Sequence, residues 1–333
     1  MNLHDLQRSG ECRKTWLDGQ ECVLTQTLDV TASTGFGMYD GRIVYAGPCD
    51  QPALRFRSCD NVSLRGLSIV VANDCHATDL IEYSNEDADP YHTTGGLFED
   101  LSLAGGGRVQ RLIYGKLSAT LNDRMTFNRV VGGGYTGAGF VLEGRNAKSY
   151  EIRSCKLYGK GVARAGIDTS TVPGSGAAFT ASNVTFAGHT DADIIIGDRN
   201  DTLTIESCYS EDSHRFLRVL DTGPGTSSGR PLPTLLKQIR FATGPSFAAD
   251  GEAVQFEACG PLEIQGGSWG NETPGHQVKI RFSPKPAPGA FTARGFFAND
   301  GDGVVFNGQK PTNDYARECI GYRDGKRVAL GAA

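Results

Sequence analysis

Short apolar segments recur along the whole of this 333-residue chain, and apolar and polar side chains alternate within each segment. Residues 61–69 and 202–206 have the clearest alternation. A period of two residues is the pattern of β-strands, and the longer period of helices is nearly absent. Because strands of this length cannot each bury a face alone, they must stack on one another to enclose a core.

A four-residue phrase marks the repeat: an apolar residue, two polar or small residues, and then a cysteine, leucine, valine or glycine. Four copies end in cysteine, at Cys59, Cys155, Cys208 and Cys259, and looser copies begin at Leu64, Phe98, Phe127, Phe186, Ile239, Ile264, Ala293 and Ala316. Copies recur roughly every 19 to 34 residues, which is the spacing of solenoid repeats. The sequence therefore predicts an all-β chain that forms a single right-handed parallel β-helix solenoid of about ten coils.

The first forty residues fit this repeat poorly, although they contain the apolar residues Leu3, Leu6, Trp16 and Leu17. An uncapped solenoid would expose unpaired strand edges at its end. We therefore expect residues 1–40 to form an N-terminal cap and residues 41–333 to form the parallel β-helix.

The nine cysteines follow the repeat and not a metal-binding pattern. No CxxC pair is present, which disfavours a zinc ribbon or a redox motif. Because in-register stacking places like residues over like, we expect the four cysteine-bearing phrases to align in one column of buried structural thiols. Cys12 and Cys22 are close in the expected cap and could form a disulfide in an oxidising compartment.

Charge and hydropathy disfavour two classes of partner. The net charge is -5 and the pI is near 5.7, so the chain lacks the basic surface that nucleic acids require. No apolar run approaches the length of a membrane span, and residues 1–8 lack the apolar core of a secretory signal. We expect no nucleic acid, no membrane span and synthesis in the cytoplasm without a signal peptide.

Residues 61–69, Asn-Val-Ser-Leu-Arg-Gly-Leu-Ser-Ile, open a short strand with asparagine. In such phrases the chain resembles the right-handed β-helix superfamily of pectin and pectate lyases and phage tailspikes. That superfamily includes lyases, galacturonases, endoglycosidases, adhesins and non-enzymatic viral parts, so the resemblance implies a fold and no single activity. The polygalacturonase pattern is missing, and Gly188-His189-Thr190 matches only a part of its Gly-His-Gly element.

The densest polar cluster spans two neighbouring coils, and its candidate catalytic residues are Asp191, Asp193, Glu211, Asp212, His214, Arg215 and Arg218. A glycosidase needs two carboxylates roughly 5 to 10 Å apart. A lyase needs a base such as arginine and a group that neutralises the substrate carboxylate. The alternative is that these residues occupy solvated turns, which aspartate favours. No metal site is predicted, and Ca²⁺ would be expected only for a lyase.

The candidate substrate-binding residues are Tyr91, His92 and His189. Tyr91 and His92 lie in an expected loop, 73–95, where an aromatic ring could stack on a sugar. Further loops are expected at 168–176 and 221–234, and two of the three begin at a similar phase after the repeat phrase, so they could wall a lateral groove. His189 aligns with the cysteine position of other coils, which favours a buried or turn histidine over a catalyst.

Two functions are consistent with these features. The first is a virion surface protein of a tailed phage, of the tailspike, head fibre or decoration type. It would bind a polysaccharide or host-surface glycan, contact other virion proteins and form a homotrimer. The alternative is a secreted polysaccharide lyase or glycosidase that acts on an acidic polysaccharide in the groove. Neither function requires an organic cofactor.

Overall fold

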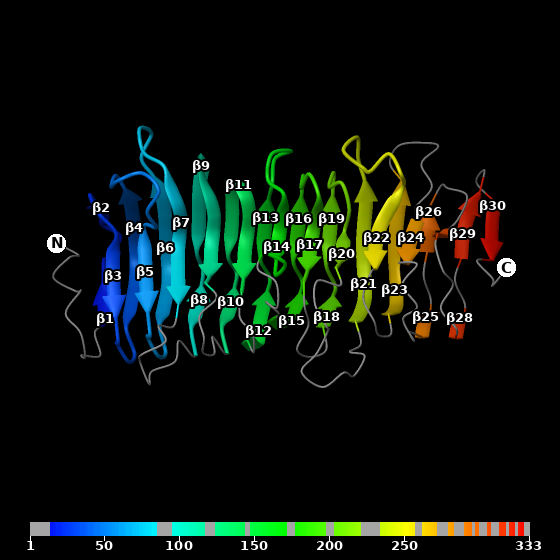
Figure 1. Ribbon diagram of the computed structural model, residues 1–333, viewed down its shortest axis with the longest axis horizontal. Coiled ribbons are helices and arrows are strands. Elements are labelled where there is room, and N and C mark those ends of the chain that lie inside the picture. The colour runs from blue at the N-terminus through cyan, green and yellow to red at the C-terminus, as the bar shows by residue number, and fades with distance from the viewer. Residues whose placement is uncertain are drawn as a thin grey trace.

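The computed structural model is a stack of β-strands that runs from the N-terminal to the C-terminal end of the chain (Figure 1). It describes residues 14–84, 95–116, 124–143, 147–171, 177–197, 203–220, 234–256, 262–271, 279–282, 290–294, 297–299, 305–307, 313–317, 320–323 and 326–329. Within these residues all the regular structure is β, and successive coils pair in parallel along three ladders of strands.

Ladder 1 begins each coil. It contains β1 (Lys14–Trp16), the first parts of β4 (Gly37–Tyr45) and β6 (Ser63–Val71), β8 (Leu97–Glu99), β10 (Thr126–Asn128), β12 (Ala147–Arg153), β15 (Ala177–Ser182), β18 (Leu203–Glu206), the first parts of β21 (Thr234–Thr243) and β23 (Leu262–Asn271), β25 (Ala290–Arg294) and β28 (Asn313–Arg317).

Ladder 2 follows after a corner. It contains β2 (Glu21–Leu24), the last parts of β4 and β6, the first parts of β9 (Ser102–Gly115) and β11 (Val131–Leu142), β13 (Lys156–Tyr158), β16 (Thr185–Ala187), β19 (Tyr209–Glu211), the last parts of β21 and β23, β26 (Phe297–Asn299) and β29 (Ile320–Arg323).

Ladder 3 completes the coil. It contains β3 (Leu28–Thr31), β5 (Leu54–Arg57), β7 (Ala77–Ser84), the last parts of β9 and β11, β14 (Ala165–Asp168), β17 (Ala192–Ile196), β20 (Leu217–Val219), β22 (Glu252–Phe256), β24 (Lys279–Phe282) and β27 (Val305–Asn307). At the C-terminal end, β30 (Lys326–Ala329) pairs antiparallel with β29 and so occupies an edge that a further coil would have used.

The predicted all-β parallel solenoid is confirmed, although the number of turns differs slightly from the ten expected. Residues 14–31 already pair in parallel with β4 and β5, and the boundary expected at residue 40 falls inside β4. The expected loop 73–95 is wrong in part, because its residues 77–84 form β7. The alternation of that strand is hidden in the sequence since both of its faces are buried.

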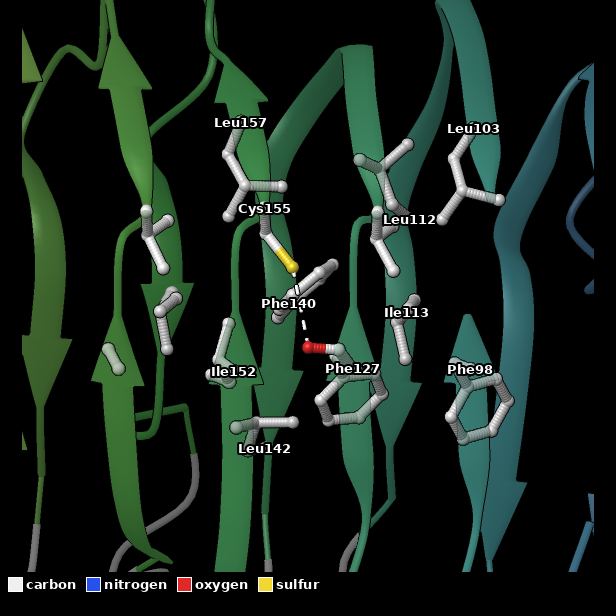
Figure 2. Close-up of a cluster of buried hydrophobic side chains, with 14 of the residues drawn as sticks. Phe98, Leu103, Leu112, Ile113, Phe127, Phe140, Leu142, Ile152, Cys155 and Leu157 are labelled. Carbon is white, nitrogen blue, oxygen red and sulfur yellow. Dashed lines mark hydrogen bonds between the residues drawn. The ribbon is translucent and has the colours of Figure 1, made fainter. Parts of the chain in front are cut away.

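The core is a column of inward side chains that repeat from coil to coil (Figure 2). Phe98 and Phe127 stack with ring centroids 5.2 Å apart, and Phe127 continues to Phe140 at 5.1 Å. The Cys155 thiol donates a weak hydrogen bond to the Phe127 carbonyl oxygen at 3.5 Å. Parallel register therefore builds continuous aromatic and aliphatic contacts along the axis.

The cysteine phrase marks corners of the coil. In 152–155 and 205–208 the third residue, Ser154 or Ser207, has φ of 52°, which is the left-handed conformation that turns the chain. Cys155 and Cys208 follow as buried side chains, in a column with the valines Val130 and Val184 of the neighbouring coils.

The expectation of one cysteine column is wrong. The phrase 56–59 leaves ladder 3, not ladder 1, so Cys59 is buried at a different corner. The same local chemistry serves both corners because each needs a compact apolar side chain after a left-handed residue. Cys259 and Cys12 lie outside the described residues, and Cys22 is a buried free thiol.

Candidate functional site

Two of the candidate residues lie in the interior, where they form a hydrogen-bonded chain with a tyrosine. His189 follows β16 at the corner toward ladder 3, and Asp193 lies in β17. His189 Nδ1 is 2.7 Å from Asp193 Oδ1, and His189 Nε2 is 2.7 Å from the Tyr135 hydroxyl. All three side chains are buried. Burial raises the pKa of Tyr135 well above its usual range, so its hydroxyl stays protonated.

His189 is buried, as expected of a buried or turn histidine, and one expectation about its position is wrong. His189 is not in the column of Cys155 and Cys208 but at the next corner of the coil. Asp193 has no exposed surface, so a polymer on the outside cannot reach it. Among the residues that the structure describes, its Oδ2 atom has no hydrogen-bond partner.

A second group lies on the outside of ladder 3. Asp191 accepts hydrogen bonds from Arg218 Nη1 on both carboxylate oxygens, each at 2.7 Å, and Arg164 Nε lies 3.4 Å from Asp191 Oδ2. Arg164 also donates to Asp168 Oδ2 at 2.8 Å, and the other oxygen of Asp168 binds the backbone and hydroxyl of Ser170. The two carboxylates and two guanidinium groups therefore neutralise each other across adjacent coils.

The remaining candidates are dispersed around the corner after β19. Glu211 is exposed and accepts from the Tyr209 hydroxyl at 2.7 Å. Asp212 is exposed, has φ of 51° and accepts from the Ser246 backbone at 3.1 Å, as a turn residue would. His214 Nδ1 is 3.1 Å from the Ser246 carbonyl oxygen. The backbone of Ser246 therefore contacts the side chains of both Asp212 and His214.

Arg215 is the last candidate in this group. It is buried, and its Nη2 atom pairs with Asp250 on the following coil at 2.5 Å. Tyr91 and His92 lie outside the described residues. The structure thus divides the predicted cluster among the interior, the outside of ladder 3 and a turn, and it does not assemble a pair of accessible carboxylates from Asp191 and Asp193.

Ladder 3 differs from ladders 1 and 2 in how accessible its outer surface is, because ladder 2 also keeps alternate residues partly exposed in β13, β16 and β19. Every residue of β14, β17 and β22 is buried, so ladder 3 is covered on both faces along these strands. Its outward residues include a second apolar cluster around Val141 and Ile195. In ladder 1, by contrast, β8, β10 and β18 keep alternate residues partly exposed. Ladder 1 is therefore an accessible lateral face.

One row of side chains follows this face. We define the outer row as the aligned positions Trp16, Tyr39, Arg65, Glu99, Asn128, Arg153, Ser182, Glu206 and Lys237. All of them are aromatic or polar, and none is fully buried. Because each stands on a different coil, the row is a periodic surface with the strand spacing of about 4.8 Å.

Hydrogen bonds order the middle of the outer row. Glu99 accepts from Asn128 Nδ2 at 2.8 Å and from Arg129 Nη2 at 2.9 Å, both on the next coil. Arg129 also binds both oxygens of Asp100, at 2.6 and 2.8 Å. This contact lowers the pKa of Asp100 below its usual range. Arg65 reaches Glu99 from the preceding coil at 3.2 Å.

Sequence reasoning missed the outer row, although a signal for it is present. Five of its members are the second residue of a copy of the repeat phrase: Arg65, Glu99, Asn128, Arg153 and Glu206. The polar second position of the phrase predicts which side chains point outward.

In the described parts of the chain, no group of three histidine, cysteine, aspartate or glutamate residues is placed to hold a metal ion. The same residues include no helix long and apolar enough to cross a membrane.

Comparisons with protein-family models, with curated proteins and with solved structures each gave no match to this chain.

Proposed function

We propose that this chain is a non-catalytic binding protein of the surface of a tailed-phage virion, and that the outer row of ladder 1 binds a glycan of the host surface. The observation that carries the proposal is the outer row itself: planar amide, carboxylate and guanidinium groups on successive coils. Such groups are the ones that hydrogen-bond sugar hydroxyls, and a repeating row suits a repeating polymer. The virion context rests on the resemblance of the repeat phrases to tailspikes.

The candidate catalytic groups give the enzymatic alternative less support. A general acid or base must reach the proton that it transfers. Asp193 is fully buried, and Asp191 is held between Arg164 and Arg218.

The test compares two exposed arginines that differ in the face they occupy. Arg153 lies in the outer row and pairs with Glu151, whereas Arg42 lies on ladder 2 and pairs with Glu21. Their side chains are 53% and 54% exposed. We expect Arg153→Ala to weaken binding to an array of bacterial O-antigen and capsular polysaccharides about tenfold, which is the loss of one charge-assisted hydrogen bond. Arg42→Ala should bind like the wild type.

Equal effects of the two substitutions would contradict the assignment of ladder 1, and no binding to any polysaccharide would contradict the function. The same polysaccharides are assayed for unsaturated uronate and for reducing ends. Product that accumulates with the wild-type chain and disappears with Asp191→Asn would establish the enzymatic alternative instead.

A further inference from the structure

Among the described residues, the N-terminal end of the outer row carries the largest apolar side chain exposed on this face. Trp16 in β1 is 52% exposed, although tryptophan normally buries most of its surface. Its ring stacks on Tyr39 of β4, with the ring centroids 5.0 Å apart and an angle of 25° between the planes. The two strands are paired in register at this position, at the end of the stack where β1 lies (Figure 1).

The glycine at position 37 fixes the orientation of this ring pair. A Cβ atom at Gly37 would lie 2.8 Å from Tyr39 Cζ, so the tyrosine ring occupies the space that a side chain there would fill. Tyr39 is therefore supported from its own strand and offers the indole a flat surface. One face of the indole lies against Tyr39, and 52% of Trp16 remains exposed.

Polar groups flank the exposed ring. Lys14 is exposed and lies two residues before Trp16 on the same face of β1. Arg65 is 56% exposed and is the next member of the outer row after Tyr39, and its guanidinium pairs with Glu99 on the following coil. An apolar plane bordered by charged donors matches one class of ligand, a pyranose ring, whose CH groups stack on an aromatic face while its hydroxyl or carboxylate groups bind the rim.

We propose that Trp16, supported by Tyr39, is a sugar-stacking subsite at the N-terminal end of the outer row. The inference rests on the proposed function, since it assigns one ring of the bound glycan to a named pair of residues. Both neutral and acidic pyranoses have CH groups that can stack on the indole face. Lys14 adds a charge partner for an acidic one.

The chain has an internal reporter for this site. It contains two tryptophans, and the second, Trp269, is fully buried in the core. A change in tryptophan emission on addition of sugar, together with protection from acrylamide quenching, therefore reports on Trp16. The probes are oligosaccharides of galacturonate as the acidic arm and of glucose as the neutral arm, besides any polysaccharide that binds on the array.

We expect at least one probe to shift the emission, Trp16→Ala to weaken its binding roughly tenfold, and Trp16→Phe to retain most of it. Val23→Ala is the matched control, because Val23 is a similarly exposed apolar residue, at 56%, on ladder 2. It should bind like the wild type.

Three results would overturn the inference. Polysaccharide binding that is lost in Arg153→Ala but unchanged in Trp16→Ala would leave the proposed function standing without this subsite. If no probe changes the emission, including a polysaccharide that binds on the array, the proposed function would also stand without this subsite. Sedimentation in which Trp16→Ala dissociates an oligomer, with no effect of sugar, would make the ring pair a contact between copies of the chain.

Discussion

His189 is held by one group from another turn of the chain and by one group from its own turn. Tyr135 reaches it from β11, and Asp193 binds it from β17. A buried polar group that loses its partner costs more than an exposed one, because water cannot replace the lost hydrogen bond. The sequence placed His189 and Asp193 in one cluster with surface residues, since spacing alone does not distinguish an inward from an outward side chain at a corner.

At the residue scale we expect His189→Ala to lower the free energy of unfolding by about 3–5 kcal/mol, because it leaves the Asp193 carboxylate buried without its donor. Asp193→Asn should cost less, since the amide oxygen still accepts from His189 Nδ1. Urea unfolding measures both. His214→Ala, which removes a partly exposed histidine from the next coil, should cost about 1 kcal/mol or less. A larger loss for Asp193→Asn than for His189→Ala would contradict this account.

At the scale of the element, the corner between β13 and β14 packs closely against Gly188 and His189 of the next coil. A Cβ atom at Gly159 would lie 2.6 Å from the Gly188 carbonyl oxygen and 2.7 Å from His189 Cδ2. The coil therefore needs a glycine there so that the histidine ring can pack below it.

We expect Gly159→Ala to destabilise the protein by about 1–3 kcal/mol through this clash. Gly133→Ala is the matched control. In β11, the nearest atom to its Cβ would be Tyr158 Cβ at 3.6 Å, which is an ordinary contact. That substitution should be neutral or stabilise slightly, because alanine restricts the unfolded chain. Thermal unfolding of the two variants decides the point, and equal midpoints would disprove the packing argument.

The strands themselves could be predicted wherever one face is exposed. Residues 63–71 and 203–206 alternate in sequence and in burial. Prediction failed where both faces are covered, as in β7, because a strand that is buried on both faces does not show the alternation of apolar and polar residues. It also failed for the outer row. Trp16 was assigned to a cap as an apolar residue, and only the pairing of β1 with β4 places its ring on the surface beside Tyr39.

At the scale of the whole molecule, buried thiols occur at separate positions along the stack. Burial raises the pKa of Cys59 and of Cys155 from 9.0 to about 11, and that of Cys208 to about 12. The folded chain therefore holds these protons more tightly than the unfolded chain does. The stability that this provides is fully present below pH 9, and it is lost as the pH rises through the folded values.

We accordingly expect the free energy of unfolding to fall between pH 9 and pH 11, by about 2–3 kcal/mol for each of Cys155 and Cys208. The double variant Cys155→Val and Cys208→Val should flatten this dependence, and valine fits because Val130 and Val184 already occupy the same column. Cys49→Val, at an exposed thiol, serves as the control and should keep the wild-type slope. Urea unfolding at pH 8, 9, 10 and 11 gives the slopes. A double variant as steep as the wild type would mean that other groups carry the alkaline loss of stability, because a valine has no proton to lose.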